Sequence, residues 1–230
     1  MKNKQTSISR IRIVARALED LAEKTAFVGG ATVSLYASDS AAFEPRPTDD
    51  VDVVVEIVSY SEFIQFEKKL RAVGFENDLE SKVICRYKIR GIIVDMMPID
   101  SAALGFSNSW YELGMKNTLE VEIAANLKVL IFQTPYFLAS KFEALMDRGM
   151  SDIRYSSDFE DIIYLFDNRA ELLEELKNAD FAVKSYLQKM IYLLLQHPII
   201  QEAIESTVEQ DFIFARATKI IQIWKEFLQA

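Results

Sequence analysis

Apolar positions along the chain follow two different periods, and the change between them divides the sequence. Up to about Gln133, short apolar or alternating runs that predict strands are interspersed with runs that repeat at three and four residues, the helical period. After Pro135 every periodic stretch has the helical period. The pattern predicts an α+β fold whose strands all precede a domain boundary near Gln133, with a helical bundle after it.

The predicted elements are bounded by glycine, proline and small polar residues. Before the boundary they are helices at residues 7–24, 31–37 and 61–73, strands at 26–28 and 50–57, and two hairpins, 83–89 with 92–97 and 118–123 with 127–132. After the boundary they are helices at residues 136–148, from 157 onward, at 181–195 and at 212–228. The composition of residues 38–47, which end in Pro45-Arg46-Pro47, predicts a loop. The aromatic segment 104–111 predicts irregular structure that either packs in the core, the preferred interpretation, or stacks on a base.

Composition and charge narrow the class of protein. Hydrophobic residues make up 50% of the 230 residues, so a sizeable core can form, and no apolar run approaches the roughly 18 residues of a membrane helix. The sequence start is amphipathic and unlike a signal peptide, so we expect a soluble, cytoplasmic protein with no membrane partner. The net charge of −9 argues against a broad basic surface for long nucleic acids, although a local cleft of Lys and Arg can hold a nucleotide or an RNA end.

Cysteine and histidine are nearly absent from the sequence. The single cysteine, Cys85, forms no internal disulfide, and together with the single histidine, His197, it is insufficient for a zinc site. We expect Cys85 to be a small core residue. Any bound metal must therefore be held by oxygen ligands.

A Gly-Gly pair, Gly29-Gly30, separates a predicted strand from a predicted helix. A strand, a glycine turn and a helix start in this order can present backbone N–H groups and the positive end of a helix dipole to a phosphate. Glycine pairs are also common at ordinary turns, and that alternative stays open for the pair by itself.

Three aspartates in predicted strands are the candidate metal ligands. Asp50 and Asp52 are two residues apart at the start of a Val-rich strand, so they share one face and the valines take the other. Asp95 stands in the middle of an otherwise apolar strand. Carboxylates held together repel one another unless a cation joins them, and all-oxygen ligation selects Mg²⁺ or Mn²⁺, which would bring a nucleoside triphosphate. The alternative for Asp95 is a structural aspartate that accepts hydrogen bonds from the backbone.

Charged residues of the C-terminal helices form a second group of candidates. Lys141 and Arg148 are seven residues apart and stack on one side of their helix, two turns from each other. Asp158 and Asp161 share a face of the next helix, whose start at residues 157–160 resembles a capping box. Taken singly, Lys141 is more typical of a solvated helix residue, and Asp158 of a favourable charge at a helix start.

Taken together, these motifs resemble the AbiEii-like nucleotidyltransferases, a branch of the DNA polymerase beta superfamily. The resemblance covers residues 27 to about 165 and consists of Gly29-Gly30, Arg46-x-Thr48-x-Asp50-x-Asp52, Asp95, Lys141 and Asp158-x-x-Asp161. It implies a mixed-sheet nucleotidyltransferase core flanked by helices in residues 1–133, and an all-helical domain in residues 134–230 that closes the cleft. The spacing from Gly30 to Asp50 is longer than is usual in the superfamily, with residues 38–45 as the insertion.

The resemblance also implies a role for each of these residues. Asp50, Asp52 and Asp95 would ligate two Mg²⁺ or Mn²⁺ ions, and Asp95 would help to activate the attacking hydroxyl. The implied catalytic set is Asp50, Asp52, Asp95, Lys141 and Asp161. In the implied nucleotide-binding set, Gly29 and Gly30 hold the triphosphate through their backbone, and Lys141 and Arg148 neutralise the phosphates. Asp158 lies beside these cations. Arg46 and Thr48 contact the substrate. Arg46 and Thr48 have an alternative role, which is to hold their loop by hydrogen bonds to Asp50.

The implied reaction transfers a nucleoside monophosphate from an NTP to a hydroxyl on RNA, such as a tRNA end, on a protein or on a small molecule, and releases pyrophosphate. Many proteins of this family are toxins of toxin–antitoxin or phage-defence pairs, so an antitoxin protein is a candidate partner. The alternative is a catalytically inactive nucleotide- or partner-binding module with the same fold. The complete set of three aspartates argues against that alternative.

Overall fold

Two compact units make up the chain. The computed structural model describes residues 2–38, 42–208 and 212–230. The first unit comprises Met1–Thr32 and Pro47–Gln133, and the second comprises Val33–Arg46 and Thr134–Ala230. Residues 39–41 of the predicted loop 38–47 lie outside the described residues.

The segment Val33–Arg46 differs from the sequence-based division, which places it in residues 1–133. Its side chains pack within the second unit. The ring of Tyr36, which is buried, lies 4.5 Å from that of Phe137. The Tyr164 hydroxyl donates a hydrogen bond to the Phe43 carbonyl at 3.2 Å. Long-range contacts of this kind determine which unit the segment belongs to. The local sequence pattern does not encode them, because the segment has little hydrophobic periodicity.

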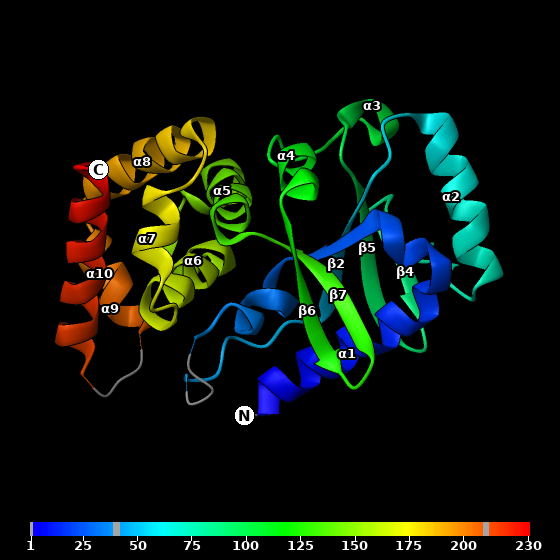
Figure 1. The fold of residues 1–230 in the computed structure, drawn as a ribbon, viewed down its shortest axis with the longest axis horizontal. Coiled ribbons are helices and arrows are strands. Elements are labelled where there is room, and N and C mark those ends of the chain that lie inside the picture. Colours follow the sequence, from blue (N-terminus) through cyan, green and yellow to red (C-terminus); the bar gives the residue numbers. More distant parts are fainter. Residues whose placement is uncertain (1, 39–41, 209–211) are drawn as a thin grey trace. The chain divides into compact units, whose positions relative to one another are not determined.

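A seven-stranded mixed sheet forms the framework of the first unit (Figure 1). Its strands are β1 (Thr25–Val28), β2 (Asp50–Val55), β3 (Glu76–Asn77), β4 (Arg86–Ile89), β5 (Ile92–Pro98), β6 (Thr118–Ala124) and β7 (Leu127–Phe132). Their order is β3-β4-β5-β2-β1-β7-β6. β2 pairs in parallel with β5 and β1 with β7, and the other neighbours are antiparallel. The predicted α+β class is confirmed, and the sheet is mixed.

The central strand β2 changes character along its length. Val53, Val54 and Val55 are all fully buried, so the end of the strand is covered on both faces. At its start only Val51 is fully buried, while Asp50 and Asp52 are partly exposed. The open face of β2 is therefore confined to the end that carries the two aspartates.

A tight turn sets the register of the hairpin β4–β5. Arg90 and Gly91 both have positive φ, 49° and 79°, as the two central residues of a type I′ turn require. The strands on either side of this turn pair Ile89 with Ile92. Arg86, four residues before Arg90, pairs with Asp95, four residues after Gly91. The predicted hairpin and its turn are confirmed.

The helices of the first unit are mostly shorter than predicted. They are α1 (Lys2–Leu18), α2 (Tyr60–Ala72), α3 (Ser101–Leu104) and α4 (Tyr111–Lys116), with the 3₁₀ helices η1 (Glu19–Lys24) and η2 (Gly30–Leu35), the last of which continues into the second unit. The helix predicted at residues 31–37 is present as η2, a single short 3₁₀ helix that begins at Gly30 and ends at Leu35. The helix predicted at 7–24 is an α-helix only to Leu18.

Helices α1 and α2 pack on different parts of the sheet (Figure 1). α1 contacts β2, β5 and β6, and its apolar face is fully buried at Ile11, Val14 and Leu18. α2 lies over β3 and β4. Its Glu67 accepts hydrogen bonds from Asn77 of β3 at 2.7 Å and from the Tyr87 hydroxyl of β4 at 3.3 Å.

The aromatic segment predicted as irregular, residues 104–111, joins α3 to α4. Trp110 is buried and Tyr111 donates a hydrogen bond to the Met97 sulfur at 3.2 Å, so both pack against the first unit. Phe106 is exposed. The preferred interpretation of core packing therefore holds for Trp110 and not for Phe106.

Helices make up the regular structure that is described in the second unit. After η2 they are α5 (Thr134–Ala144), η3 (Leu145–Gly149, a π-helical turn), η4 (Ile153–Tyr155, 3₁₀), α6 (Ser157–Asn168), α7 (Leu172–Lys177), α8 (Phe181–Leu195), α9 (Ile200–Thr207) and α10 (Ile213–Leu228). The bounds predicted for α8 are confirmed. The short helices α7 and α9 were not predicted, because one or two turns give little periodicity.

The start of α6 differs by one residue from the predicted capping box. The N-cap is Ser156, whose hydroxyl accepts a hydrogen bond from the Phe159 backbone N–H at 3.3 Å. Ser157 is already helical.

None of the helices in the described parts of the chain combines the length and the apolar character needed to cross a membrane.

Candidate functional site

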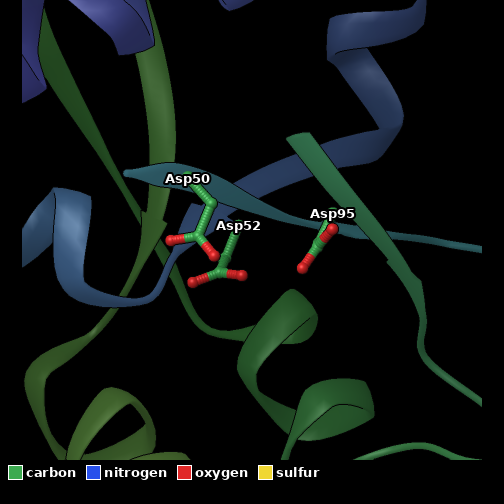
Figure 2. A group of neighbouring side chains, drawn as sticks. All are labelled: Asp50, Asp52 and Asp95. Carbon is green, nitrogen blue, oxygen red and sulfur yellow. The ribbon is translucent and has the colours of Figure 1, made fainter. Parts of the chain in front are cut away.

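Three carboxylates meet at the start of β2 and form the carboxylate triad, Asp50, Asp52 and Asp95. The parallel register of β2 and β5 places Asp52 directly opposite Asp95, with Asp50 opposite Ile93. One carboxylate oxygen of each aspartate lies within 4.8 Å of one oxygen from each of the other two. All three side chains project to the same side of the strands (Figure 2). The structure thus brings together the three residues that the sequence analysis proposed as metal ligands.

Arg86 in β4 joins the carboxylate triad. Its Nε and Nη2 donate hydrogen bonds to the two carboxylate oxygens of Asp95 at 2.8 and 2.7 Å. Nη2 also lies 3.5 Å from a carboxylate oxygen of Asp50. Hydrogen bonding to Asp95 raises the pKa of Arg86, so the guanidinium stays charged.

The sequence analysis did not single out Arg86, although a signal for it exists. Arg86 and Asp95 are each four residues from the predicted two-residue turn Arg90-Gly91, and a hairpin with such a turn pairs residues at equal distances from it. Residues paired in this way have their side chains on the same face of the sheet. The predicted hairpin was therefore sufficient to place a cation opposite Asp95.

Repulsion among the aspartates is the main electrostatic cost of this arrangement. Two like charges about 5 Å apart repel by about 1 kcal/mol in water and about 3 kcal/mol at the effective dielectric of a protein surface. Arg86 supplies one positive charge against the three carboxylates. When all three are ionised, Arg86 balances one of their three negative charges, so the triad still attracts a cation.

Thr48 and Arg10 hold the chain as it enters β2. The Thr48 hydroxyl lies 3.1 Å from both the backbone carbonyl and a carboxylate oxygen of Asp50. Arg10 of α1 donates a hydrogen bond to the Thr48 carbonyl and lies 3.9 Å from Asp49. Thr48 therefore makes the supporting contact with Asp50 that the sequence analysis gave as one of its alternatives.

Gly29 lies against the Asp52 carboxylate. It has a φ of 70°, in the left-handed region, and a Cβ added to it would lie 1.8 Å from an oxygen of Asp52. Only glycine satisfies both the backbone conformation and this close approach. Gly30 follows as the first residue of η2, whose single short 3₁₀ helix offers a much smaller dipole than the predicted α-helix.

Cys85 precedes β4 and is buried beside the carboxylate triad. Burial, together with the negative charge of Asp95, raises the pKa of its thiol to about 12. With a raised pKa the thiol is protonated at neutral pH and is a weak nucleophile there. The expectation that Cys85 is a core residue is confirmed.

The donor set of the carboxylate triad fits a divalent cation. Carboxylate oxygens are the ligands that Mg²⁺ and Mn²⁺ prefer, and oxygens on opposite sides of an octahedral Mg²⁺ are about 4.2 Å apart. Oxygens within 4.8 Å of one another need only small side-chain movements to reach that spacing. Arg86 uses one lone pair on each Asp95 oxygen and leaves others for a ligand bond.

A second group of charged residues lies in the second unit and is called the charge cluster: Arg46, Lys141, Arg148, Asp158 and Asp161. Lys141 Nζ lies 2.6 Å from Asp161 and 3.2 Å from Asp158. Arg148 donates two hydrogen bonds to the Asp158 carboxylate at 2.9 and 3.1 Å. Arg46 donates two to the Asp161 carboxylate, also at 2.9 and 3.1 Å. Three cations therefore surround two carboxylates, and the partly buried carboxylate of Glu160 lies near enough to influence the pKa of Arg46.

The interior of the charge cluster is almost completely buried. The side chains of Asp158 and Asp161 are 2% and 1% exposed, and that of Lys141 is 9% exposed. Burial lowers the pKa of Arg46, but the charge and hydrogen bonds of Asp161 outweigh it and leave that pKa raised. The interpretation of Lys141 as a solvated helix residue is wrong, because its ammonium is held between two buried carboxylates.

Arg148 differs from the other members of the charge cluster because its side chain is 67% exposed. It lies in the π-helical turn η3, and such turns are frequent at functional sites. Lys141 and Arg148, predicted to stack two turns apart, both contact Asp158. Arg46 makes its ion pair with Asp161, a partner that the sequence analysis did not foresee.

Comparison of the chain with protein-family models and with curated proteins gives no match. The resemblance to AbiEii-like nucleotidyltransferases therefore stays a hypothesis that rests on the residues described above.

We predict that Gly29→Ala destabilises the first unit more than Gly91→Ala does. Both glycines have positive φ, so both substitutions carry a backbone cost of about 1–2 kcal/mol. A Cβ at Gly91 meets no atom within 4 Å, whereas one at Gly29 collides with Asp52. Urea unfolding of the two variants measures the difference, and equal losses would show that the contact with Asp52 is unimportant.

Arg86→Gln is expected to lower the melting temperature of the protein without divalent ions, because it removes charged hydrogen bonds that contribute about 1–3 kcal/mol. The increase in melting temperature on adding Mn²⁺ should be larger than in the parent protein, since the ion then meets three carboxylates without a neighbouring cation. Arg71→Gln, which removes an exposed ion pair with Glu67, is the control. A Mn²⁺-induced increase no larger than that of the parent contradicts the prediction.

Lys141→Met should destabilise the protein by about 3–5 kcal/mol, because it leaves two buried carboxylates with one cation fewer. Lys177→Met removes an ion pair with the exposed Glu174 and should change stability by less than about 0.5 kcal/mol. Chemical denaturation of both variants measures these values. A loss at Lys141 as small as the control would show that the buried ion pairs contribute little to stability.

Proposed function

We propose that the protein is a metal-dependent nucleotidyltransferase of the AbiEii-like type. The observation that carries the proposal is the convergence of Asp50, Asp52 and Asp95 from two adjacent parallel strands. Their negative charge is compensated only in part by Arg86, which is the condition under which a carboxylate group binds a divalent ion.

The proposed reaction is an in-line displacement at the α-phosphorus of an NTP. The oxygen of an acceptor hydroxyl forms a bond to that phosphorus, the bond from it to the bridging oxygen of the β-phosphate breaks, and pyrophosphate leaves. Asp50, Asp52 and Asp95 would hold Mg²⁺ or Mn²⁺, which when bound supplies positive charge to the entering and leaving oxygens. Asp95 would also take the hydroxyl proton, through a lone pair that Arg86 does not use.

Residues around the carboxylate triad support this proposal through their positions. Gly29 brings bare backbone against Asp52, which leaves room for that carboxylate at the start of the strand. Thr48 fixes the Asp50 carboxylate and limits its rotation. Arg86 would orient Asp95 as an acceptor by holding both of its oxygens.

The charge cluster has the composition expected of a phosphate-binding group. Arg148 carries the one largely exposed cationic side chain among its five members, and that side chain would attract an anion. Lys141 would act mainly by fixing Asp158 and Asp161. The roles of these residues and of Arg46 at the nucleotide are part of the proposal.

An inactive nucleotide- or partner-binding module is the second candidate, and the ion pair of Arg86 with Asp95 is the observation that favours it. An arginine that neutralises a carboxylate pair makes the group more stable without metal. Transfer of label from an NTP distinguishes the two candidates, because a module that binds nucleotides without catalysis transfers none.

We predict that the protein, incubated with each labelled NTP, Mg²⁺ and bacterial RNA, transfers label to an acceptor, and that Asp50→Asn lowers the rate at least about 1,000-fold. Asp49→Asn is the matched control, because Asp49 is adjacent in sequence and its side chain is 98% exposed. Expression of the parent protein should arrest growth if it is a toxin, and Asp50→Asn should relieve the arrest. Binding of NTP with no transfer to RNA, protein or small-molecule hydroxyls rejects the enzyme and favours the inactive module.

A further inference from the structure

Helix α1 is strongly basic in an acidic protein. It contains Lys2, Lys4, Arg10, Arg12 and Arg16 and no acidic residue. The whole chain has a net charge of −9. A concentration of positive charge on one helix of such a chain marks a local surface that attracts anions.

One face of α1 combines three of these cations with hydrogen-bonding side chains. Lys2, Gln5, Ser9, Arg12 and Arg16 recur at intervals of three and four residues and therefore share a face, which we call the basic face. The residues of this face are exposed, apart from Arg12, which is partly buried. With a rise of 1.5 Å per residue, the face extends over about 20 Å.

The cations of the basic face have little internal compensation. Within the part of the chain that the structure describes, Lys2, Arg12 and Arg16 make no ion pair, and Arg12 Nε is buried without a hydrogen-bond partner. Phosphate oxygens are strong acceptors for arginine.

Contacts at one end of β2 connect α1 to the carboxylate triad. Arg10 donates a hydrogen bond to the Thr48 carbonyl, and the Thr48 hydroxyl contacts the Asp50 carboxylate. The basic helix and the triad therefore adjoin the same short segment of chain. The carboxylates project from the face of the sheet away from α1 (Figure 2), so an RNA bound along α1 reaches them by passing around the start of β2.

We infer that the basic face of α1 binds the phosphate backbone of an RNA whose terminal hydroxyl is the acceptor at the carboxylate triad. This inference rests on the proposed function for the role of the bound RNA, but the binding itself needs neither NTP nor metal. Side chains such as Gln and Ser between cations are typical of contacts to phosphate and sugar.

An anionic membrane is the alternative partner for a basic helix, and the burial of α1 argues against it. A helix that lies in a membrane interface inserts an apolar face into the lipid. The apolar face of α1 is already used, since Ile11, Val14 and Leu18 are fully buried in the first unit. Apart from Ile8 and Ile13, which are partly exposed, only polar and charged side chains of α1 remain for a partner.

The test compares two variants with the same change in charge. K2Q/R12Q/R16Q removes the cations of the basic face, and K68Q/K69Q/K82Q removes three exposed lysines of the same unit outside α1. Binding to fluorescent single-stranded RNA with a 3′-hydroxyl is measured by anisotropy, without NTP or divalent ion, between 50 and 200 mM salt. Circular dichroism establishes that both variants are folded.

We expect the basic-face variant to bind about 100-fold more weakly at 0.1 M salt, and the slope of log K against log salt to fall by about 2, as the loss of three phosphate contacts predicts. The control variant should bind within about threefold of the parent. Equal weakening of the two variants, or no RNA binding by the parent, overturns the inference. Binding of the parent to phosphatidylserine vesicles but not to RNA overturns it in favour of a membrane.

The outcome separates this inference from the proposed function. Loss of RNA binding in the basic-face variant, with no label transfer by the parent, supports the RNA site and rejects the nucleotidyltransferase. Label transfer to RNA that the basic-face variant performs at the parent's rate rejects the RNA site and supports the enzyme.

Discussion

The parallel pairing of β2 with β5 is the constraint on which the rest of the first unit depends. It puts two carboxylates directly opposite each other, with a third two residues away, at the one end of the central strand that is not covered on both faces. The guanidinium of Arg86 and the hydroxyl of Thr48 reduce the resulting repulsion, and the absence of a side chain at Gly29 leaves room for the Asp52 carboxylate. These features are local, yet they come from three different segments of the chain. A sheet that holds like charges together in this way has an unfavourable electrostatic energy at one place. Functional sites commonly have such locally unfavourable arrangements.

The second unit handles its acidic residues in the opposite way. Asp158 and Asp161 are more deeply buried than the aspartates of the carboxylate triad, and each is held by two cations. Burial of ionised carboxylates is tolerated only with such complete pairing. Arg86 is shared between two carboxylates of the triad, whereas each carboxylate of the charge cluster has two cations. The triad is suited to attract a further cation, and the exposed Arg148 of the charge cluster is suited to attract an anion.

The parts of this structure that could be predicted from the sequence are those that depend on local periodicity. The hairpin at Arg90-Gly91, the valine-rich strand with its two aspartates and the helix α8 follow from alternation, turn residues and helical spacing. The meeting of Asp95 with Asp52 was proposed because an acid in an apolar strand needs an explanation, but the parallel register that joins them is set by tertiary packing. The partner of Arg46 could not be predicted, because Asp161 is 115 residues away and no periodic pattern links the two. The grouping of residues 33–46 with the second unit could not be predicted for the same reason.

The length of the turn between β4 and β5 has a consequence for the charge balance of the site. Side chains alternate between the two faces of a strand, so a register shift of one residue moves every side chain of β4 to the opposite face. An insertion or deletion that shifted the register in this way would leave Tyr87 or Cys85 opposite Asp95 and carry Arg86 to the other side of the sheet. The number of residues in a surface turn thus determines whether Asp95 has a counter-ion. Loop-length variation, which most proteins tolerate well, is expected to be excluded at Arg90-Gly91 for an electrostatic reason.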